Sequence, residues 1–547
     1  MPIMNLNDGL IQSHLTMQTM SLDELSRVAR ENGNAAYYNA IGLFKSMQKQ
    51  RNNGYGKTIA SIQFLGNQFR DYIVQQVKNN PGGMGAGGLL GYIHKFVEME
   101  VGRSVTMQGH VDVLWRVAYY ALRCGDLNCV REVIASGTQV DDILVQYVNE
   151  ACRVGGGIEA LGKMNSGLVD AMGELYRRVQ SRSAGVGGSQ EGREYELAVL
   201  ALLSFSPLEN AWVQKTSEDY IFMGLWNAIR SEADCVEKVC ALADNVKHYG
   251  PAHFEDGLEQ SDGWVYAMLL LLCQQMKSGL GHLAGKSAEG LCVAVHLGLA
   301  LDEQGIGLTD LSKADDATSS EDDLATLVAA YATSLQDISP AAALDYLVHI
   351  PGSIKTGIEL KNGKNLTKIS QDQICRLLLE TKAFAVLAGK MAPDGSRLAV
   401  GALDKHFTNR GVSDILALTA DQSMREGKVA DAAELLSLAG RYSDLLSVLN
   451  RQLASLLVTN NADERMFWRN AAVNFHSTYL VQGQTHVLQV LEAERNLSLG
   501  NTFQMLLNLM TFFDRCDEGN WEVSFAFASF WDIFACLISL MFNDQRS

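Results

Sequence analysis

Apolar residues recur every three or four positions along most of this chain. A typical stretch lies between residues 114 and 134, where one apolar stripe ends at a short polar turn and a second follows. The first stripe consists of Leu114, Ala118, Ala121 and Leu122, and the second of Leu127, Val130 and Ile134. This spacing places the apolar side chains on one face of a helix. The pattern therefore predicts two helices joined by a tight turn.

The same unit recurs far downstream, between residues 429 and 456. The first stripe contains Val429 and Leu436, and the second begins at Tyr442. Gly440 stands between them, as expected of a helix C-terminal cap that needs a positive φ. Ser339-Pro340 predicts a helix start, because serine caps helices and proline at the first helical position loses no hydrogen bond.

Antiparallel helix pairs of this kind, repeated over several hundred residues, predict an all-α fold: an elongated, irregular α-solenoid. Only 7 of the 547 residues are proline, which permits long helices. We find no pair of strand-like segments around an Asn-Gly or Asp-Gly turn. Asp262-Gly263 and Asp394-Gly395 are expected to flank helices instead.

Composition shifts suggest how the chain is divided. A Gly-rich stretch at 79–88 predicts a linker between a short helical N-terminal region, 1–78, and a solenoid domain, 89–520. Two further polar stretches, 181–193 and 313–323, are predicted loops. Residues 521–547 are expected to form an apolar C-terminal helix.

The charge of the chain limits its ligands. Lys and Arg number 45 and Asp and Glu number 62, which gives a formal net charge of −17. An acidic surface repels phosphate backbones, so we expect no direct binding of nucleic acid.

Several motifs imitate sites of chemistry but lack an essential part. Gly56-Lys57-Thr58 and Gly285-Lys286-Ser287 end like phosphate-binding loops, yet each lacks the first glycine of that motif. The GxGxxG match at 83–88 follows a helical pattern rather than a strand. The 10 cysteines have no zinc spacing, and His296 lies in an apolar helix, which favours a core position. We expect no catalytic residue, metal or cofactor, and the chain is not predicted to be an enzyme.

Six segments, in the same order, resemble the nucleoporin-interacting-component family of inner-ring scaffold nucleoporins, typified by vertebrate nucleoporin ninety-three and its yeast Nic-type counterpart. The segments are VLWRVAYYALRCGD (113–126), TSEDYIFMGLW (216–226), SPAAALDY (339–346), DGSRLAVGALDKHF (394–407), the helix pair at 426–449, and LLNLMTFFD (506–514). The signature residues that they supply are expected to be structural: Trp115, Tyr119, Tyr120, Arg123, Cys124, Gly125, Asp126, Glu218, Asp219, Tyr220, Trp226, Asp394, Gly395, Ser396, Arg397, Phe512 and Phe513.

The resemblance implies a folded-back α-solenoid that bridges other nucleoporins in the inner ring of the nuclear pore complex, at the nuclear envelope, and so supports nucleocytoplasmic transport. It implies three kinds of partner: large inner-ring solenoids, coiled-coil channel nucleoporins and a membrane-associated inner-ring nucleoporin. Membrane contact is then expected to be indirect. The alternative is a helical-repeat adaptor or vesicle-coat-like scaffold outside the pore.

Both ends of the chain depart from the family pattern. The family places much of its docking in a long N-terminal extension, and here about eighty residues precede the linker. The candidate docking helix carries Leu22, Leu25, Val28 and Ala29, and the alternative is a helix that caps the solenoid. The run from Val523 to Phe542 is long enough to span a bilayer, but Asp532 interrupts it. We therefore favour a helix packed on protein over one inserted in lipid.

Overall fold

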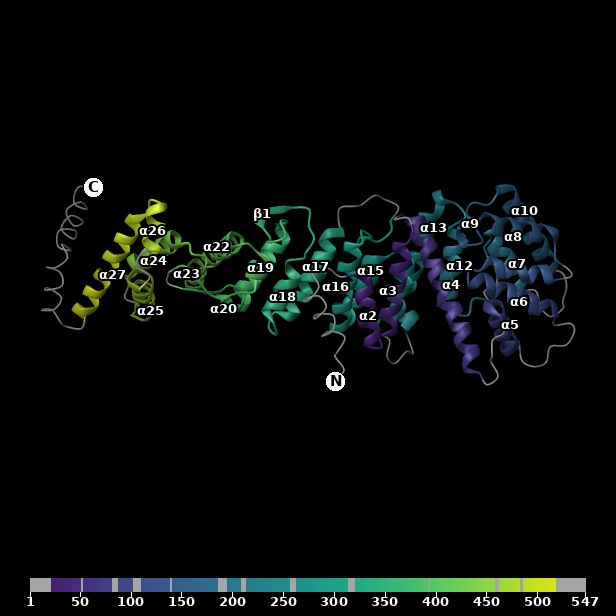
Figure 1. Cartoon of the computed structure of the whole chain (residues 1–547), viewed down its shortest axis with the longest axis horizontal. Coiled ribbons are helices and arrows are strands. Elements are labelled where there is room, and N and C mark those ends of the chain that lie inside the picture. Colours follow the sequence, from purple (N-terminus) through teal and green to yellow (C-terminus); the bar gives the residue numbers. More distant parts are fainter. Residues whose placement is uncertain are drawn as a thin grey trace. The chain divides into compact units, whose positions relative to one another are not determined.

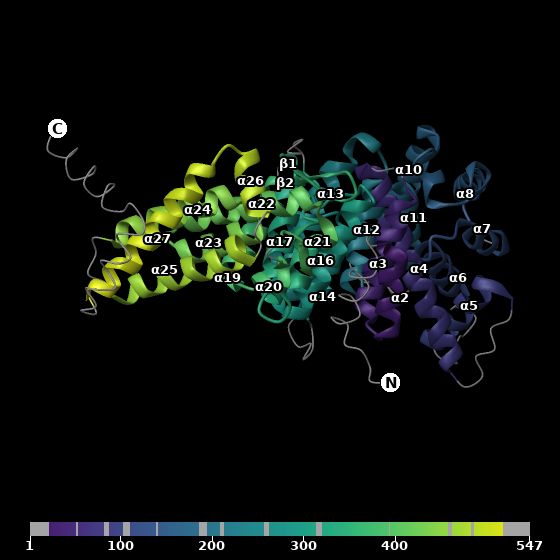
Figure 2. The ribbon, with the colours of Figure 1, turned by 60° about the vertical axis from the view of Figure 1, so that its left-hand side comes forward.

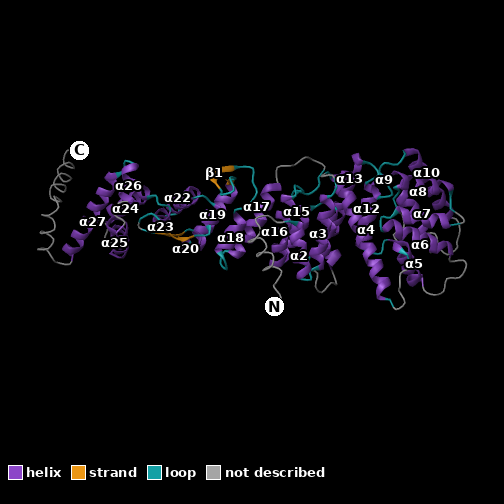
Figure 3. Ribbon diagram, in the orientation of Figure 1, coloured by secondary structure: helices purple, strands orange, loops and turns teal. Residues whose placement is uncertain are grey.

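The computed structural model describes residues 21–50, 53–80, 87–101, 110–137, 140–184, 194–207, 213–255, 262–312, 320–392, 394–457, 462–482 and 486–517. Helices dominate these residues, and short strands occur in one region only (Figure 3). The predicted all-α class, built from antiparallel helix pairs, is confirmed. The chain divides into two compact units, Met1–Leu327 and Val328–Ser547, which are described separately.

The described part of the first unit begins with a helical hairpin and a long helix. Its described helices up to α12 are α2 (Leu22–Glu31), α3 (Ala35–Gln48), α4 (Gly54–Asn79), α5 (Gly88–Val101), α6 (His110–Arg123), α7 (Leu127–Ser136), α8 (Asp142–Val154), α9 (Ile158–Leu161), α10 (Ser166–Ala184), α11 (Glu194–Ser204) and α12 (Ser217–Ala228). Helices α5 to α8 each pack on the preceding helix, α10 packs on α8, and α11 returns to α6. Helix α12 then packs on α4, so this part of the chain folds back on itself.

The remaining helices of this unit are α13 (Glu232–Glu255), α14 (Trp264–Leu272), α15 (Met276–Lys286), α16 (Ala288–Glu303) and the first part of α17 (Ser320–Leu335). Helix α3 contacts α14 and α16. Helix α4 contacts α12 and α13, which are labelled beside it in Figure 1. The N-terminal helices are therefore built into the same unit as residues 89–327, whereas composition suggested a separate region.

The second unit continues with α18 (Pro340–Leu347), α19 (Lys368–Thr381), α20 (Phe384–Leu387), α21 (Leu403–His406), α22 (Asn409–Arg425), α23 (Val429–Leu438), α24 (Tyr442–Leu456), α25 (Ala462–Phe475), the π-helical η4 (His476–Gln482), α26 (His486–Ala493) and α27 (Leu497–Asp517). Helices α22, α23 and α24 pack in succession, and α27 returns to cover α24 and α25 (Figure 2).

The prediction that no strand pair exists is wrong. Strands β1 (Lys355–Glu359) and β2 (Asn365–Thr367) form one antiparallel hairpin, and β3 (Gly389–Met391) and β4 (Arg397–Val400) form another. Asn362-Gly363 makes the first turn and Asp394-Gly395 the second, where Gly363 and Gly395 have φ of 77° and 80°. The strands have three to five residues and are mostly exposed, so they lack the apolar alternation that reveals a strand.

The predicted helix ends are confirmed where their caps were identified. The Ser339 side chain accepts a hydrogen bond from the backbone of Ala342 at the start of α18. Gly440 has a φ of 68°, and the amide of Arg441 donates to the carbonyl of Leu436. This is the Schellman cap that the glycine predicted.

The predicted loops are shorter than expected. Helix α10 continues to Ala184, and α17 begins at Ser320, so both enter the polar stretches assigned as loops. Helix α4 ends at Asn79 and α5 begins at Gly88, and residues 81–86 of the predicted Gly-rich linker lie outside the described residues. The apolar run 523–542 lies outside the described residues. Within the described part of the chain, no helix is long and apolar enough to cross a membrane.

Candidate interaction site

Arg123, the last residue of α6, lies at the centre of a junction between helices of the first unit. Its side chain is only 3% exposed. The Nε atom donates to Oδ1 of Asp219 at 3.0 Å, and Nη1 donates to the carbonyl of Leu65 at 3.2 Å. Arg123 therefore ties α6 to α12 and to α4, which are distant in sequence.

Asp219 is fixed by the start of α12. Its amide donates to Oγ1 of Thr216, and its Oδ2 accepts from the amides of Thr216 and Lys215, each at 3.2 Å. This reciprocal arrangement is a capping box with aspartate as its acidic member. The Thr-Ser-Glu-Asp sequence thus begins the helix and holds a carboxylate in place for Arg123.

Two phenylalanines enclose the guanidinium of Arg123. Its central carbon lies 4.8 Å from the ring centroid of Phe69 on α4 and 4.2 Å from that of Phe222 on α12. Aromatic faces attract a cation most strongly when water is excluded. The ion pair is therefore buried, bonded and covered, as a buried charge requires.

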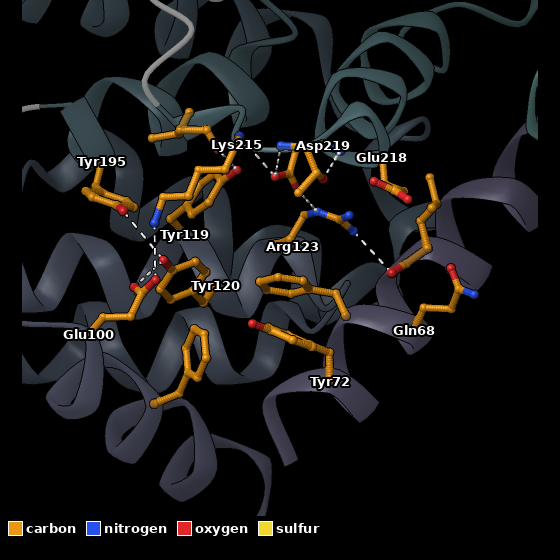
Figure 4. Close-up of a pocket in the computed structure, with 15 residues that line it drawn as sticks. Gln68, Tyr72, Glu100, Tyr119, Tyr120, Arg123, Tyr195, Lys215, Glu218 and Asp219 are labelled. Carbon is orange, nitrogen blue, oxygen red and sulfur yellow. Dashed lines mark hydrogen bonds and ion pairs between the residues drawn. The ribbon is translucent and has the colours of Figure 1, made fainter. Parts of the chain in front are cut away.

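A cavity of about 340 Å³ opens beside this junction, between α4, α5, α6, α11 and the segment that leads into α12 (Figure 4). Its wall is largely aromatic: Phe69, Tyr72, Phe96, Tyr119, Tyr120 and Tyr195. The ring of Tyr120 lies 5.4 Å from that of Phe96 and 6.0 Å from that of Tyr195. Polar groups occur at its edges, where Lys215 pairs with Glu100 at 3.1 Å and Tyr120 donates to Glu100.

The cavity offers groups suited to binding. Burial raises the pKa of the Tyr119 and Tyr120 phenols, so both remain neutral. Burial likewise raises the pKa of the neighbouring Cys124 thiol to about 12, which leaves it unreactive at neutral pH. Rigid aromatic walls with a few polar groups at the rim are typical of sites that accept an apolar side chain.

Arg123 and Asp219 belong to the first two segments that resemble the family, 113–126 and 216–226, so their ion pair brings these segments together. Ion pairs join the third segment, 339–346, to the fourth, 394–407, in the same way. Asp345 of the Ser-Pro-Ala-Ala-Ala-Leu-Asp-Tyr segment contacts His406 and lies 2.9 Å from Nζ of Lys405. Arg397 pairs with Asp404 at 2.6 Å and also donates to the carbonyl of Ala388.

The last segment makes a similar junction. Asp514, next to the edge-to-face pair Phe512 and Phe513, forms ion pairs with Arg465 and Arg469 of α25, each at 3.1 Å. Charged residues of five resembling segments therefore pair with residues of other helices or turns. They hold the chain's own elements in place.

The other signature residues are mostly buried or turn-forming. Trp115, Tyr119, Tyr120 and Cys124 are buried in α6 or at its end, and Trp226 donates to the carbonyl of Leu202. Gly125 has a φ of 75° and Asp126 caps α7. Glu218 and Tyr220 are exposed, Asp394 and Ser396 hydrogen-bond within the hairpin turn, and Gly395 packs against His486.

The candidate docking face of α2 is covered by the chain itself. Leu22, Leu25, Val28 and Ala29 are at most 4% exposed, and α2 packs on α3. This arrangement suits a helix that caps the unit, and the four side chains are not available for a partner.

The two imitation phosphate loops are helical. Lys57 lies in α4 and donates to the carbonyl of Ile306, and burial lowers its pKa. Lys286 ends α15 and pairs with Glu255. His296 is fully buried and donates to the carbonyl of Cys292, as expected of a core histidine. The described residues contain no cluster of three potential metal ligands.

Sequence reasoning missed most of the cavity wall. Outside the resembling segments lie Phe69, Phe96, Glu100, Tyr195 and Lys215, which come from α4, α5, α11 and the segment before α12. No local spacing connects them, so only the folded chain could identify the site.

The structure is that of an α-helical protein whose charged signature residues join distant helices. The comparisons with known proteins identify its family. The Nup93/Nic96 family model matches residues 27–528, and the chain belongs to this family.

The relatives support the same conclusion. The chain is 24% identical over 497 residues to the nuclear pore complex protein Nup93 of Xenopus tropicalis, covering 85% of this chain and 55% of that protein. It is 24% identical over 378 residues to the nucleoporin NIC96 of Saccharomyces cerevisiae, covering 64% and 40%. The crystal structure of Chaetomium thermophilum Nic96 SOL has the same fold, with a TM-score of 0.62 and 15% identity over 96% of this chain and 86% of that one. The chain spans about half the length of the curated relatives that it matches.

Proposed function

We propose that this chain is a structural scaffold subunit of the inner ring of the nuclear pore complex, where it bridges other nucleoporins and so supports nucleocytoplasmic transport. The family match across residues 27–528 carries this proposal. Its relatives are named as a nuclear pore complex protein and a nucleoporin. The chain acts by binding and performs no catalysis.

The buried ion pairs and the aromatic cavity have different roles in this proposal. The ion pairs of Arg123, Asp345 and Asp514 stiffen the scaffold, because each joins elements distant in sequence. The aromatic cavity beside Arg123 receives a side chain of a partner nucleoporin. Candidate partners are large inner-ring solenoids, coiled-coil channel nucleoporins and a membrane-associated inner-ring nucleoporin.

Tyr72 offers the sharpest test of the cavity, because it lines the wall and is 48% exposed. Tyr38, which is 40% exposed and lies on α3 outside the cavity, is the matched control. Tagged full-length chains are purified gently from cells, and the co-purifying proteins are quantified. Tyr72→Ala should lower the recovery of at least one nucleoporin about tenfold, the loss expected at an aromatic anchor, while Tyr38→Ala leaves recovery unchanged.

Localisation tests the proposed function itself. The tagged chain should form a rim at the nuclear envelope and co-purify with nucleoporins. Vesicular puncta and coat subunits in their place would favour an adaptor outside the pore and overturn the proposal. Equal recovery of every nucleoporin with both tyrosine variants would reject the cavity as a docking site.

A further inference from the structure

Helix α25 of the second unit buries one apolar face and exposes the apolar side chains of Met466 and Val473 on the opposite face, where Asn470 lies between them. Trp468, Ala472 and Phe475 are buried on its inner face, and Phe475 packs edge-to-face on Phe503 of α27 at 5.7 Å. Met466 and Val473 lie two turns apart on the outer face and are 58% and 45% exposed. The two exposed side chains give a further apolar element a place to pack on this helix.

The end of α27 lies along one side of this outer stripe. Asp514 binds Arg465 and Arg469, which are one turn apart on α25. By helical periodicity these arginines lie between the inner face and the Met466–Val473 stripe. The chain that continues beyond Asp517 therefore starts beside the exposed stripe.

The sequence after α27 has the matching composition. Residues 523–542 read VSFAFASFWDIFACLISLMF, with one charged residue, Asp532. The five residues 518–522 can span about 16–18 Å, which is enough to reach α25. The stripe between residues 466 and 473 is only about 10 Å long at the helical rise. A predominantly apolar run of twenty residues can cover it.

We propose that residues 523–542 of this chain dock on the Met466–Val473 stripe of α25. The adjacent end of α27, the short connection and the two exposed apolar side chains all point to this occupant. Such docking buries the apolar run 523–542, of a kind that soluble proteins seldom leave in contact with water, together with the side chains of Met466 and Val473. The proposal concerns a contact within the second unit and does not depend on the proposed function.

Oxidation of Met466 tests the contact directly, because methionine sulfoxide forms readily only where the thioether is accessible. The full chain and a chain ending at residue 522 are exposed to dilute peroxide, with Met424 of α22 as an internal reference. Peroxide should oxidise Met466 at least fivefold more slowly in the full chain than in the shortened chain. Equal rates would overturn the proposal.

A second variant approaches the same contact from the other side. Met466→Glu in the full chain should speed hydrogen exchange of residues 523–542 at least tenfold, because a carboxylate opposes an apolar partner. Ile338→Glu is the control, since Ile338 is 83% exposed in the turn before α18. Unchanged exchange in Met466→Glu would refute the contact. A different result would also refute the contact. If deleting 523–547 abolishes binding to anionic phospholipid vesicles but leaves the oxidation rate of Met466 unchanged, the apolar run binds lipid and not α25.

Discussion

Replacing Asp219 by alanine should destabilise the junction of α4, α6 and α12 strongly. The substitution leaves Arg123 buried at 3% exposure without its carboxylate partner. Removing one member of a buried pair costs about 3–5 kcal/mol, because the remaining charge stays desolvated. The Oδ2 atom of Asp219 also accepts from two backbone amides at the start of α12. Losing that half of the capping box costs about 1 kcal/mol, so we expect a total of about 4–6 kcal/mol.

Native-state hydrogen exchange of the α6 and α12 amides measures this loss. Hydrogen exchange reports the free energy of local opening, so it can be used for a chain of two compact units whose global unfolding need not be one transition. Glu218→Ala is the matched control: Glu218 is the exposed neighbour of Asp219, and its loss should change the opening free energy by less than about 0.5 kcal/mol.

The double variant Arg123→Met with Asp219→Leu separates charge from packing. Apolar replacement of a buried ion pair is often neutral, so the double variant should recover most of the stability lost in Asp219→Ala. A loss below about 1 kcal/mol in Asp219→Ala would contradict the reasoning. Equal instability of the double variant would show that packing rather than the unpaired charge explains the loss.

Two further predictions concern a helix cap and a buried carboxylate. Gly440→Ala should destabilise the α23–α24 turn by about 1–2 kcal/mol, because its φ is 68°. Gly173→Ala, within α10 and with open space around it, should stabilise α10 by about 0.5–1 kcal/mol. Local hydrogen exchange should therefore become faster around Gly440→Ala and slower around Gly173→Ala. Burial alone would raise the pKa of Asp345, but the bonds from His406 and Lys405 outweigh it and hold the pKa below its ordinary value. A lowered folded pKa gives stability that is present above the unfolded pKa, about 3.9, and is lost as pH falls through the folded value. The second unit should therefore lose stability below about pH 4, and Asp345→Asn should weaken that dependence; an identical pH profile in the variant would refute it.

The helices and many of their ends could be predicted because the determinants are local. Apolar spacing reports one buried face, and Ser339, Asp126 and Gly440 act on backbone groups within a few residues. The hairpin turns are also local, yet they were missed. Asn362-Gly363 and Asp394-Gly395 are typical turn dipeptides, but their strands are too short and exposed to show a period.

The sequence by itself determined that this chain is helical, acidic and similar to a known scaffold family, because those properties follow from composition, periodicity and short motifs. Only the tertiary structure decided what the signature residues do. Arg123 and Asp219 are 96 residues apart, and nothing in their local sequence states that they pair. The aromatic cavity and the burial of the apolar face of α2 likewise depend on contacts between segments that are distant in sequence. A contact between distant segments depends on how helices pack, and packing satisfies all the apolar faces and buried charges of a unit together.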